Sequence, residues 1–187
     1  RHYLKSWSVA FLLFAIYVVC LTGYSFLGAN PTEWRVLWLL FEFSYIFSCY
    51  AFAIWVLVGV REAVTSERIP SRTVNQLLLL VGFIALFSVV VFAFDANINP
   101  WKRYLQINLR LLFIGSALLV SGIWLFSLQN KIFVTKLVAS SILLWGTQFV
   151  VMALVSVWLG QGETMDRVVI VSKHLELFCQ TILGLGL

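Results

Sequence analysis

The sequence predicts an all-α protein, a polytopic bundle of membrane-spanning helices. Composition is the first reason: 61% of the 187 residues are hydrophobic and 11% are charged, whereas a soluble domain carries about 25% charged residues. The second is that apolar runs of about 20 residues, the length that a helix needs to cross a bilayer, fill most of the chain. The third is that no run alternates apolar and polar residues, as the strands of a membrane barrel do.

The first three apolar runs predict membrane helices over residues 7–27, 36–60 and 77–94. The first run is too long for the apolar core of a signal peptide and lacks a small-residue cleavage site. The second begins after residues 30–33, a polar segment with a proline that is typical of a helix start. The third follows residues 61–76, the longest predicted connection, which contains Pro70 and charges of both signs.

The last three runs predict helices over residues 105–128, 132–158 and 168–187. The fourth run follows the segment Asn99-Pro100-Trp101. The sixth reaches the end of the chain without a cap or a polar tail, and the chain begins without an initiator methionine. We therefore expect a single transmembrane domain with six helices in this fragment, truncated before a cytoplasmic output domain. A further helix before Arg1 would make seven in the full protein.

Lysine and arginine orient the bundle, because cytoplasmic loops carry more of them than external loops do. With the N-terminus in the cytoplasm, seven of the thirteen lie on the cytoplasmic side and six on the other. The seven are Arg1, Lys5, Arg61, Arg68, Arg72, Lys131 and Lys136. The cluster from Arg61 to Arg72 decides the choice, and six helices then place the C-terminus in the cytoplasm. The basic residues behind the net charge of +5 lie in short segments between apolar runs, where they orient the helices. We therefore expect no nucleic-acid partner.

Two carboxylates lie inside predicted spans, where an ionisable group costs about 2.5–3.5 kcal/mol on insertion scales. Glu42 lies about 9 Å and Glu176 about 12 Å past the start of its run, at about 1.5 Å per residue. In this orientation both carboxylates lie in the outer half of the membrane, and so does Arg110. Glu42, Tyr45 and Cys49 share one helix face at i, i+3 and i+7 spacing.

These residues predict a polar cluster that is open to the outside and binds a ligand. Its members are Glu42, Tyr45, Asn108, Arg110, Gln148, Glu176 and Gln180. Structural roles stay open for them, since Arg110 could extend to the headgroups and the carboxylates and glutamines could join helices. Small residues at helical spacing predict close helix packing at Gly115 and Gly122, Ala117 and Ser121, and Gly146 and Ala153.

The residues that most cofactor chemistry requires are missing. The two histidines, His2 and His174, lie near span ends and cannot supply the paired ligands of a membrane haem site. Cys20, Cys49 and Cys179 are scattered without CxxC spacing, which is typical of small apolar core residues and not of a zinc site. We therefore expect no metal, no cofactor and no catalysis within this fragment.

Three stretches carry a resemblance to a known class of proteins. Residues 1–8 form a basic and aromatic start to a helix, residues 45–62 form an aromatic helix ending in Gly-Val-Arg-Glu, and residues 175–187 contain Gln180 and a Gly-Leu-Gly step. This pattern resembles the multi-helix N-terminal sensor region of bacterial membrane signalling proteins, chiefly diguanylate cyclases and sensor histidine kinases.

The resemblance implies a signal-input module of the bacterial inner membrane, which relays an external or membrane signal through its last helix to a cytoplasmic signalling domain. It also implies a homodimer in contact with the lipid bilayer and with a small-molecule or lipid ligand. Two alternatives stay open: a small transporter or channel subunit that uses the intramembrane carboxylates, and an accessory or scaffold subunit of a membrane complex. Against the transporter, no run has a proline in its middle and the halves show no inverted repeat.

Overall fold

A computed structural model describes residues 2–27, 34–93, 100–127 and 133–159. These residues form the helices α1 (His2–Leu27), α2 (Arg35–Thr65), α3 (Ser71–Ala93), α4 (Pro100–Ser127) and α5 (Phe133–Leu159). Each of the five contains a stretch long and apolar enough to cross a membrane. The all-α class is therefore confirmed, and five of the six predicted spans are helices that indicate an integral membrane protein. The sixth, residues 168–187, lies outside the described residues.

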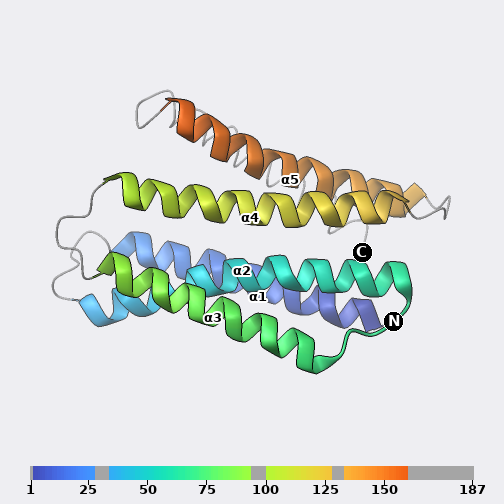
Figure 1. Cartoon of the computed structure of the whole chain (residues 1–187), viewed down its shortest axis with the longest axis horizontal. Helices are drawn as coiled ribbons and strands as arrows, with labels where there is room; N and C mark the ends of the chain where they lie inside the picture. Colours follow the sequence, from blue (N-terminus) through green and yellow to red (C-terminus); the bar gives the residue numbers. More distant parts are fainter. Residues whose placement is uncertain (1, 28–33, 94–99, 128–132, 160–187) are drawn as a thin grey trace.

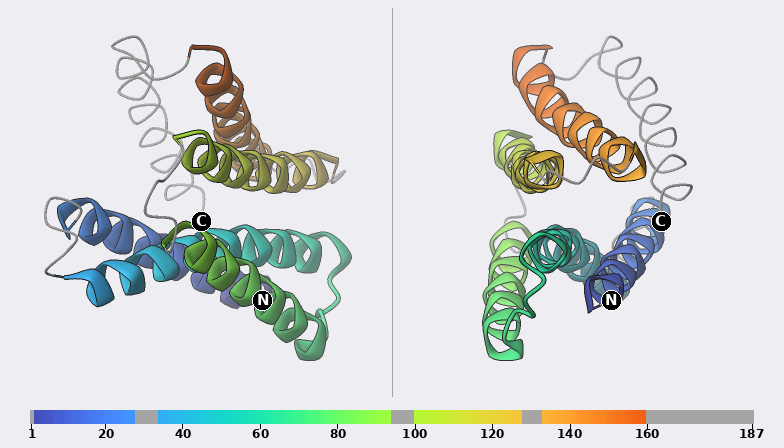
Figure 2. Two further views of the ribbon diagram at one scale, coloured as in Figure 1. Left: turned by 60° about the vertical axis from the view of Figure 1, so that its left-hand side comes forward. Right: turned by 90° about the vertical axis from the view of Figure 1, so that its right-hand side faces the viewer.

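The helices lie in two layers that share one long axis (Figures 1 and 2). One layer contains α1, α2 and α3, and the other contains α4 and α5. The most extensive packing is within the antiparallel pairs α1–α2 and α4–α5, while α2 also contacts α3 and α4. Because α2 touches three neighbours, it is the most deeply buried of the five membrane stretches. It therefore holds the two layers together.

The connection between α2 and α3 is shorter than the sequence predicts. We expected a polar segment over residues 61–76, but α2 continues to Thr65 and α3 begins at Ser71. The polar residues after Val60 stay helical because Glu62 is buried against α1. Ser66 then ends α2 in the left-handed conformation, with φ 58°, and the carbonyl of Pro70 accepts the first backbone hydrogen bonds of α3.

Two other helices also begin earlier than predicted. Helix α1 starts at His2 instead of residue 7, and α4 starts at Pro100 instead of residue 105. Proline suits the first helical position, because its ring fixes a helical φ and an N–H there has no helical acceptor. Arg110 consequently lies ten residues after the start of α4, which is about 15 Å along the axis.

An aromatic cluster joins the two layers at the centre of the molecule. The Trp145 ring of α5 lies 5.4 Å from the Phe14 ring of α1 and 5.6 Å from the Phe52 ring of α2, measured between centroids. Phe14 and Phe52 also contact each other, at 5.3 Å. These tilted and edge-on arrangements are the favourable ones for aromatic rings. Trp145 is only 1% exposed, so this cluster is the middle of the core.

Glycines bring the backbones of α4 and α5 together. A Cβ atom on Gly115 would lie 3.0 Å from the carbonyl oxygen of Gly146, and one on Gly146 would lie 2.9 Å from that of Gly115. A Cβ atom on Gly122 would lie 2.6 Å from the Cγ atom of Leu143. Small residues allow membrane helices to approach closely where apolar burial drives little association. The packing role predicted for these three glycines is confirmed.

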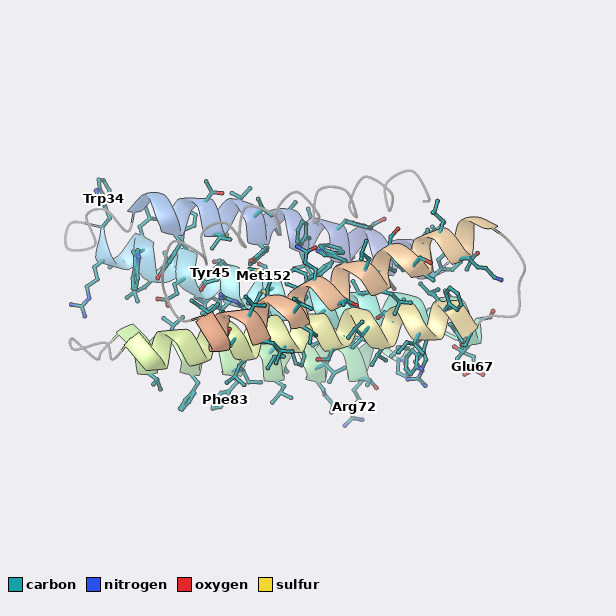
Figure 3. All side chains as sticks on the ribbon, turned by 90° about the horizontal axis from the view of Figure 1, so that it is seen from above. Trp34, Tyr45, Glu67, Arg72, Phe83 and Met152 are labelled. Atoms are coloured by element: carbon teal, nitrogen blue, oxygen red, sulfur yellow. The ribbon has the colours of Figure 1, made fainter. Side chains whose placement is uncertain are left out.

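Helix α3 lies at the edge of its layer and presents large apolar side chains outward. Phe83 projects away from the bundle in Figure 3 and is 67% exposed, and Leu79 is 74% exposed. A water-soluble protein does not normally expose so many contiguous apolar side chains. This surface is suited to contact with lipid chains.

Candidate functional site

The predicted ligand-binding residues that the structure describes are all buried. Their side chains are between 4% and 7% exposed: Glu42, Tyr45, Asn108, Arg110 and Gln148. They lie inside the bundle and not on its lipid-facing surface. The other two predicted members, Glu176 and Gln180, lie outside the described residues.

Arg110 and Tyr45 form a contact between α4 and α2. The guanidinium carbon of Arg110 lies 4.6 Å from the centroid of the Tyr45 ring, which is a cation–π geometry. Tyr17 of α1, together with Cys49 and Tyr50 of α2, is within electrostatic reach of the same guanidinium. Arg110 is 7% exposed, so its side chain is buried between helices and does not lie on the outer surface of the bundle.

Within the described part of the chain, one nitrogen of the buried Arg110 guanidinium has no hydrogen-bond acceptor. A guanidinium carries five N–H donors and stays charged in proteins, and burying a charge is costly unless it is paired and hydrogen-bonded. The Tyr45 ring offsets this cost by about 2 kcal/mol in a desolvated site. The Nη1 atom of Arg110, however, has no hydrogen-bond partner among the described residues. The site therefore presents a buried cation with a donor available for an acceptor.

Asn108 lies on a different side of α4 from Arg110. The two residues are two positions apart in the helix, a spacing at which side chains do not face each other. The hydroxyl of Ser156 in α5 donates a hydrogen bond of 2.5 Å to Oδ1 of Asn108. The Nδ2 atom of Asn108 has no acceptor within the described ranges. Arg110 thus faces α2 while Asn108 faces α5.

Glu42 is buried on the same face of α2 as Tyr45, and Gln148 is buried on α5. Glu42, Tyr45 and Cys49 are all buried, as expected for residues that share one face of α2. Gln148 lies three residues after Trp145 on α5, close to the face that contacts α1 and α2. Arg110 and Tyr45 are two predicted residues that the structure brings into contact across α4 and α2.

Sequence reasoning missed a second buried carboxylate, Glu62, at the far end of α2. Its Oε2 atom accepts a hydrogen bond of 2.7 Å from the Ser6 hydroxyl, and its Oε1 atom accepts one of 3.2 Å from the backbone N–H of Ile69. We expected Glu62 in a loop because it follows the last apolar run. The signal that could have placed it is its helical spacing from Trp55 and Val58, which precede it by seven and four residues on the same face.

The described residues contain no group of three or more histidine, cysteine, aspartate or glutamate side chains that could hold a metal ion. Comparisons with protein-family models, with curated proteins and with solved structures found no match to this chain. The candidate site is therefore defined by its own geometry: a buried guanidinium, an aromatic ring on one side of it, and an unfilled donor.

Proposed function

We propose that the protein is a membrane-embedded signal-input module in which the Arg110–Tyr45 pair binds a carboxylate ligand between α4 and α2. The observation that carries the proposal is that Arg110 is 7% exposed while its Nη1 atom has no hydrogen-bond partner in the described part of the chain. A carboxylate would supply an acceptor for this atom and a charge opposite to that of the guanidinium. Arginine and carboxylate groups form short, charge-assisted hydrogen bonds, often two at a time.

The position of Arg110 on α4 suggests how binding is relayed. One face of α4 carries Arg110, and another carries Gly115, whose backbone touches that of α5. Because this contact leaves no space for the helices to approach further, a displacement of α4 moves α5 with it. Helix shifts of about 1–2 Å are a common form of switching, and a coupling free energy of about 1–3 kcal/mol gives a useful response.

In this proposal the chain that follows α5 passes the shift to a cytoplasmic signalling domain, such as a diguanylate cyclase or a histidine kinase. The resemblance of residues 1–8, 45–62 and 175–187 to such sensors supports this part of the proposal. Those output domains work as dimers, so the module would be dimeric and would lie in a bacterial inner membrane.

The first experiment measures carboxylate binding. The purified protein in phosphatidylcholine nanodiscs is unfolded by heat with acetate, succinate or benzoate at millimolar concentration. We expect at least one of the three to raise the unfolding midpoint, and we expect Arg110→Gln to abolish that rise. Arg72→Gln is the matched control, because Arg72 is exposed and projects away from the bundle (Figure 3). A wild-type protein that responds to none of the three, or an Arg110→Gln variant that responds equally, would contradict the proposal.

The second experiment separates the sensor from a transporter, the alternative that the buried carboxylate of Glu42 keeps open. Proteoliposomes are given a gradient of the carboxylate that stabilises the protein in the first experiment. A sensor binds this anion and does not carry it, so uptake should equal that of protein-free liposomes. Uptake above that level which Arg110→Gln removes would assign the same site to transport.

A further inference from the structure

A pocket of about 200 Å³ lies where α1, α2 and α3 meet the α2–α3 connection, residues 66–70. It is at the other end of the bundle from Arg110, since Glu62 follows Tyr45 by seventeen residues along α2, or about 25 Å. Neither Arg110 nor Tyr45 lines this pocket, so it is separate from the proposed carboxylate site. Its volume exceeds the space of about 30 Å³ that one water molecule occupies in the liquid, so it can hold a group of several heavy atoms.

The charges that line the pocket are unequal. Lys5 of α1 and Arg68 of the connection supply two cations, and Glu62 supplies one anion. Both oxygens of Glu62 already accept hydrogen bonds, from Ser6 and from the Ile69 N–H, whereas Lys5 and Arg68 are exposed at the rim. The pocket therefore attracts anions.

The start of α3 adds to this attraction. Ser71, the first residue of α3, lines the pocket. The first-turn N–H groups of a helix lack helical acceptors and form the positive end of its dipole. Arg68, three residues before Ser71 in the chain, lines the same pocket.

The opposite wall of the pocket is apolar. Trp55 and Val58 line it from the candidate membrane stretch of α2, whereas Arg68 belongs to the α2–α3 connection, outside the candidate stretches. The pocket thus spans the boundary between an apolar helix surface and a polar connection. A phospholipid has the same arrangement at the edge of the hydrocarbon layer, where its phosphate is followed by glycerol and acyl chains.

We propose that this pocket binds an anionic phosphate group, with Lys5 and Arg68 as its cationic contacts. The apolar wall formed by Trp55 and Val58 suits a phospholipid headgroup, in which glycerol carbons follow the phosphate. Inorganic phosphate has the same anionic chemistry but cannot use that wall.

Native mass spectrometry of the protein from a non-ionic detergent tests this site. The probe is phosphatidylglycerol, with inorganic phosphate and zwitterionic phosphatidylcholine in parallel titrations. Each basic residue near an anionic lipid surface contributes about 1 kcal/mol. We therefore expect Lys5→Gln with Arg68→Gln to weaken phosphatidylglycerol binding about 30-fold, at about 1.4 kcal/mol per tenfold. Both side chains are exposed, so the double variant retains the fold.

The matched control is Arg61→Gln with Arg72→Gln. Both arginines are exposed near the same end of the bundle, and neither lines the pocket. This double variant removes the same net charge from outside the pocket and should weaken phosphatidylglycerol binding much less than the pocket variant does. Equal losses in the two double variants, or no loss in either, would overturn the proposal.

The other two titrations identify the source of the phosphate. Phosphatidylcholine should bind at least tenfold more weakly than phosphatidylglycerol, and equal binding would overturn the proposal because charge would not matter. Inorganic phosphate should bind more weakly than the lipid. If it instead binds as tightly, with the same dependence on Lys5 and Arg68, the phosphate site is supported and its natural ligand is a soluble anion.

Discussion

At the scale of single residues, Glu62 and Arg110 are both buried but are stabilised in different ways. Glu62 has a hydrogen-bond donor for each of its oxygens, one from a side chain of α1 and one from the backbone after α2. Arg110 rests on the ring of Tyr45 and has an Nη1 atom without a partner among the described residues. Both oxygens of Glu62 already accept hydrogen bonds, whereas the Nη1 atom of Arg110 can donate one to another group. This difference separates a structural carboxylate from a candidate binding site.

The Ser6–Glu62 hydrogen bond should be measurable as stability. Ser6→Ala leaves one oxygen of a buried carboxylate without its donor, which costs about 1–3 kcal/mol. Ser8→Ala is the control, since the Ser8 hydroxyl is exposed and bonds only to the carbonyl of Leu4 in its own helix, and such surface changes stay within about 0.5 kcal/mol. The measurement is unfolding in mixed micelles with increasing dodecyl sulfate. Equal midpoints for the two variants would show that the hydrogen bond contributes nothing.

The Tyr45 ring should stabilise the buried guanidinium of Arg110. Tyr45→Phe keeps an aromatic face under the guanidinium, whereas Tyr45→Leu removes it. We expect the leucine variant to be less stable than the phenylalanine variant by about 1–2 kcal/mol, the range of a desolvated cation–π contact. The same micelle titration measures both. If the leucine variant were more stable than the phenylalanine variant, the ring would not stabilise the cation.

At the scale of helices, the α4–α5 pair should tolerate no added atom at its glycines. A methyl group on Gly146 would lie 2.9 Å from both Leu119 N and Gly115 O. Backbone atoms cannot turn aside as a side chain can, so Gly146→Ala forces the helices apart at a cost of about 1–3 kcal/mol.

Gly82→Ala is the matched control for this prediction. A methyl group there would lie 3.7 Å from the nearest side-chain atom, Cε2 of Phe47, which is an ordinary contact. Replacing glycine by alanine within a helix favours the helix by about 1 kcal/mol. We therefore expect Gly146→Ala to lower the unfolding midpoint and Gly82→Ala to leave it unchanged or raise it. A destabilised Gly82→Ala variant would contradict this.

The helices themselves were predictable from the sequence, but their ends were not. Apolar runs long enough to cross a bilayer identified α1 to α5, because length and hydropathy are properties of each run alone. The run ended at Val60 where polar residues begin, yet α2 continues because Glu62 finds donors on α1 and in the connection. The donor on α1 is remote in the sequence, and the donor in the connection lies beyond the end of α2. Helix ends therefore depend on tertiary contacts that the apolar pattern omits.

The candidate site was predictable only in part for a similar reason. Helical spacing placed Glu42, Tyr45 and Cys49 on one face of α2, and all three are buried. Spacing does not tell which neighbouring helix a face meets. It could not show that Arg110 lies over Tyr45 while Asn108 bonds to Ser156 on another helix.

At the scale of the whole molecule, five of the seven basic side chains that the structure describes lie toward one end of the bundle. These basic residues lie near the α2–α3 connection, or at the ends of α1 and α5 that are on the same side of the bundle. They are Lys5, Arg61, Arg68, Arg72 and Lys136. By the positive-inside rule this end should be cytoplasmic. Trp34 and Glu67 lie at opposite ends of the molecule (Figure 3).

Single cysteines should therefore report two sides of the membrane. In a variant whose three native cysteines are replaced by alanine, Trp34→Cys should react with an impermeant maleimide in intact cells. Glu67→Cys and Lys136→Cys should react only after the membrane is permeabilised. Labelling of Glu67→Cys and not Trp34→Cys in intact cells would invert the orientation. Labelling of both from one side would contradict the five membrane-spanning helices.

The length of α2 has a mechanical consequence. Its 31 residues extend about 46 Å at about 1.5 Å per residue, whereas the hydrocarbon layer is about 30 Å thick. Such an excess is accommodated by helix tilt, by local thickening of the bilayer, or by projection of one end into water. Because α2 contacts α1, α3 and α4, a change in its tilt moves its neighbours as well. A change in bilayer thickness would therefore shift the whole bundle, because it acts on α2, the longest of the described helices.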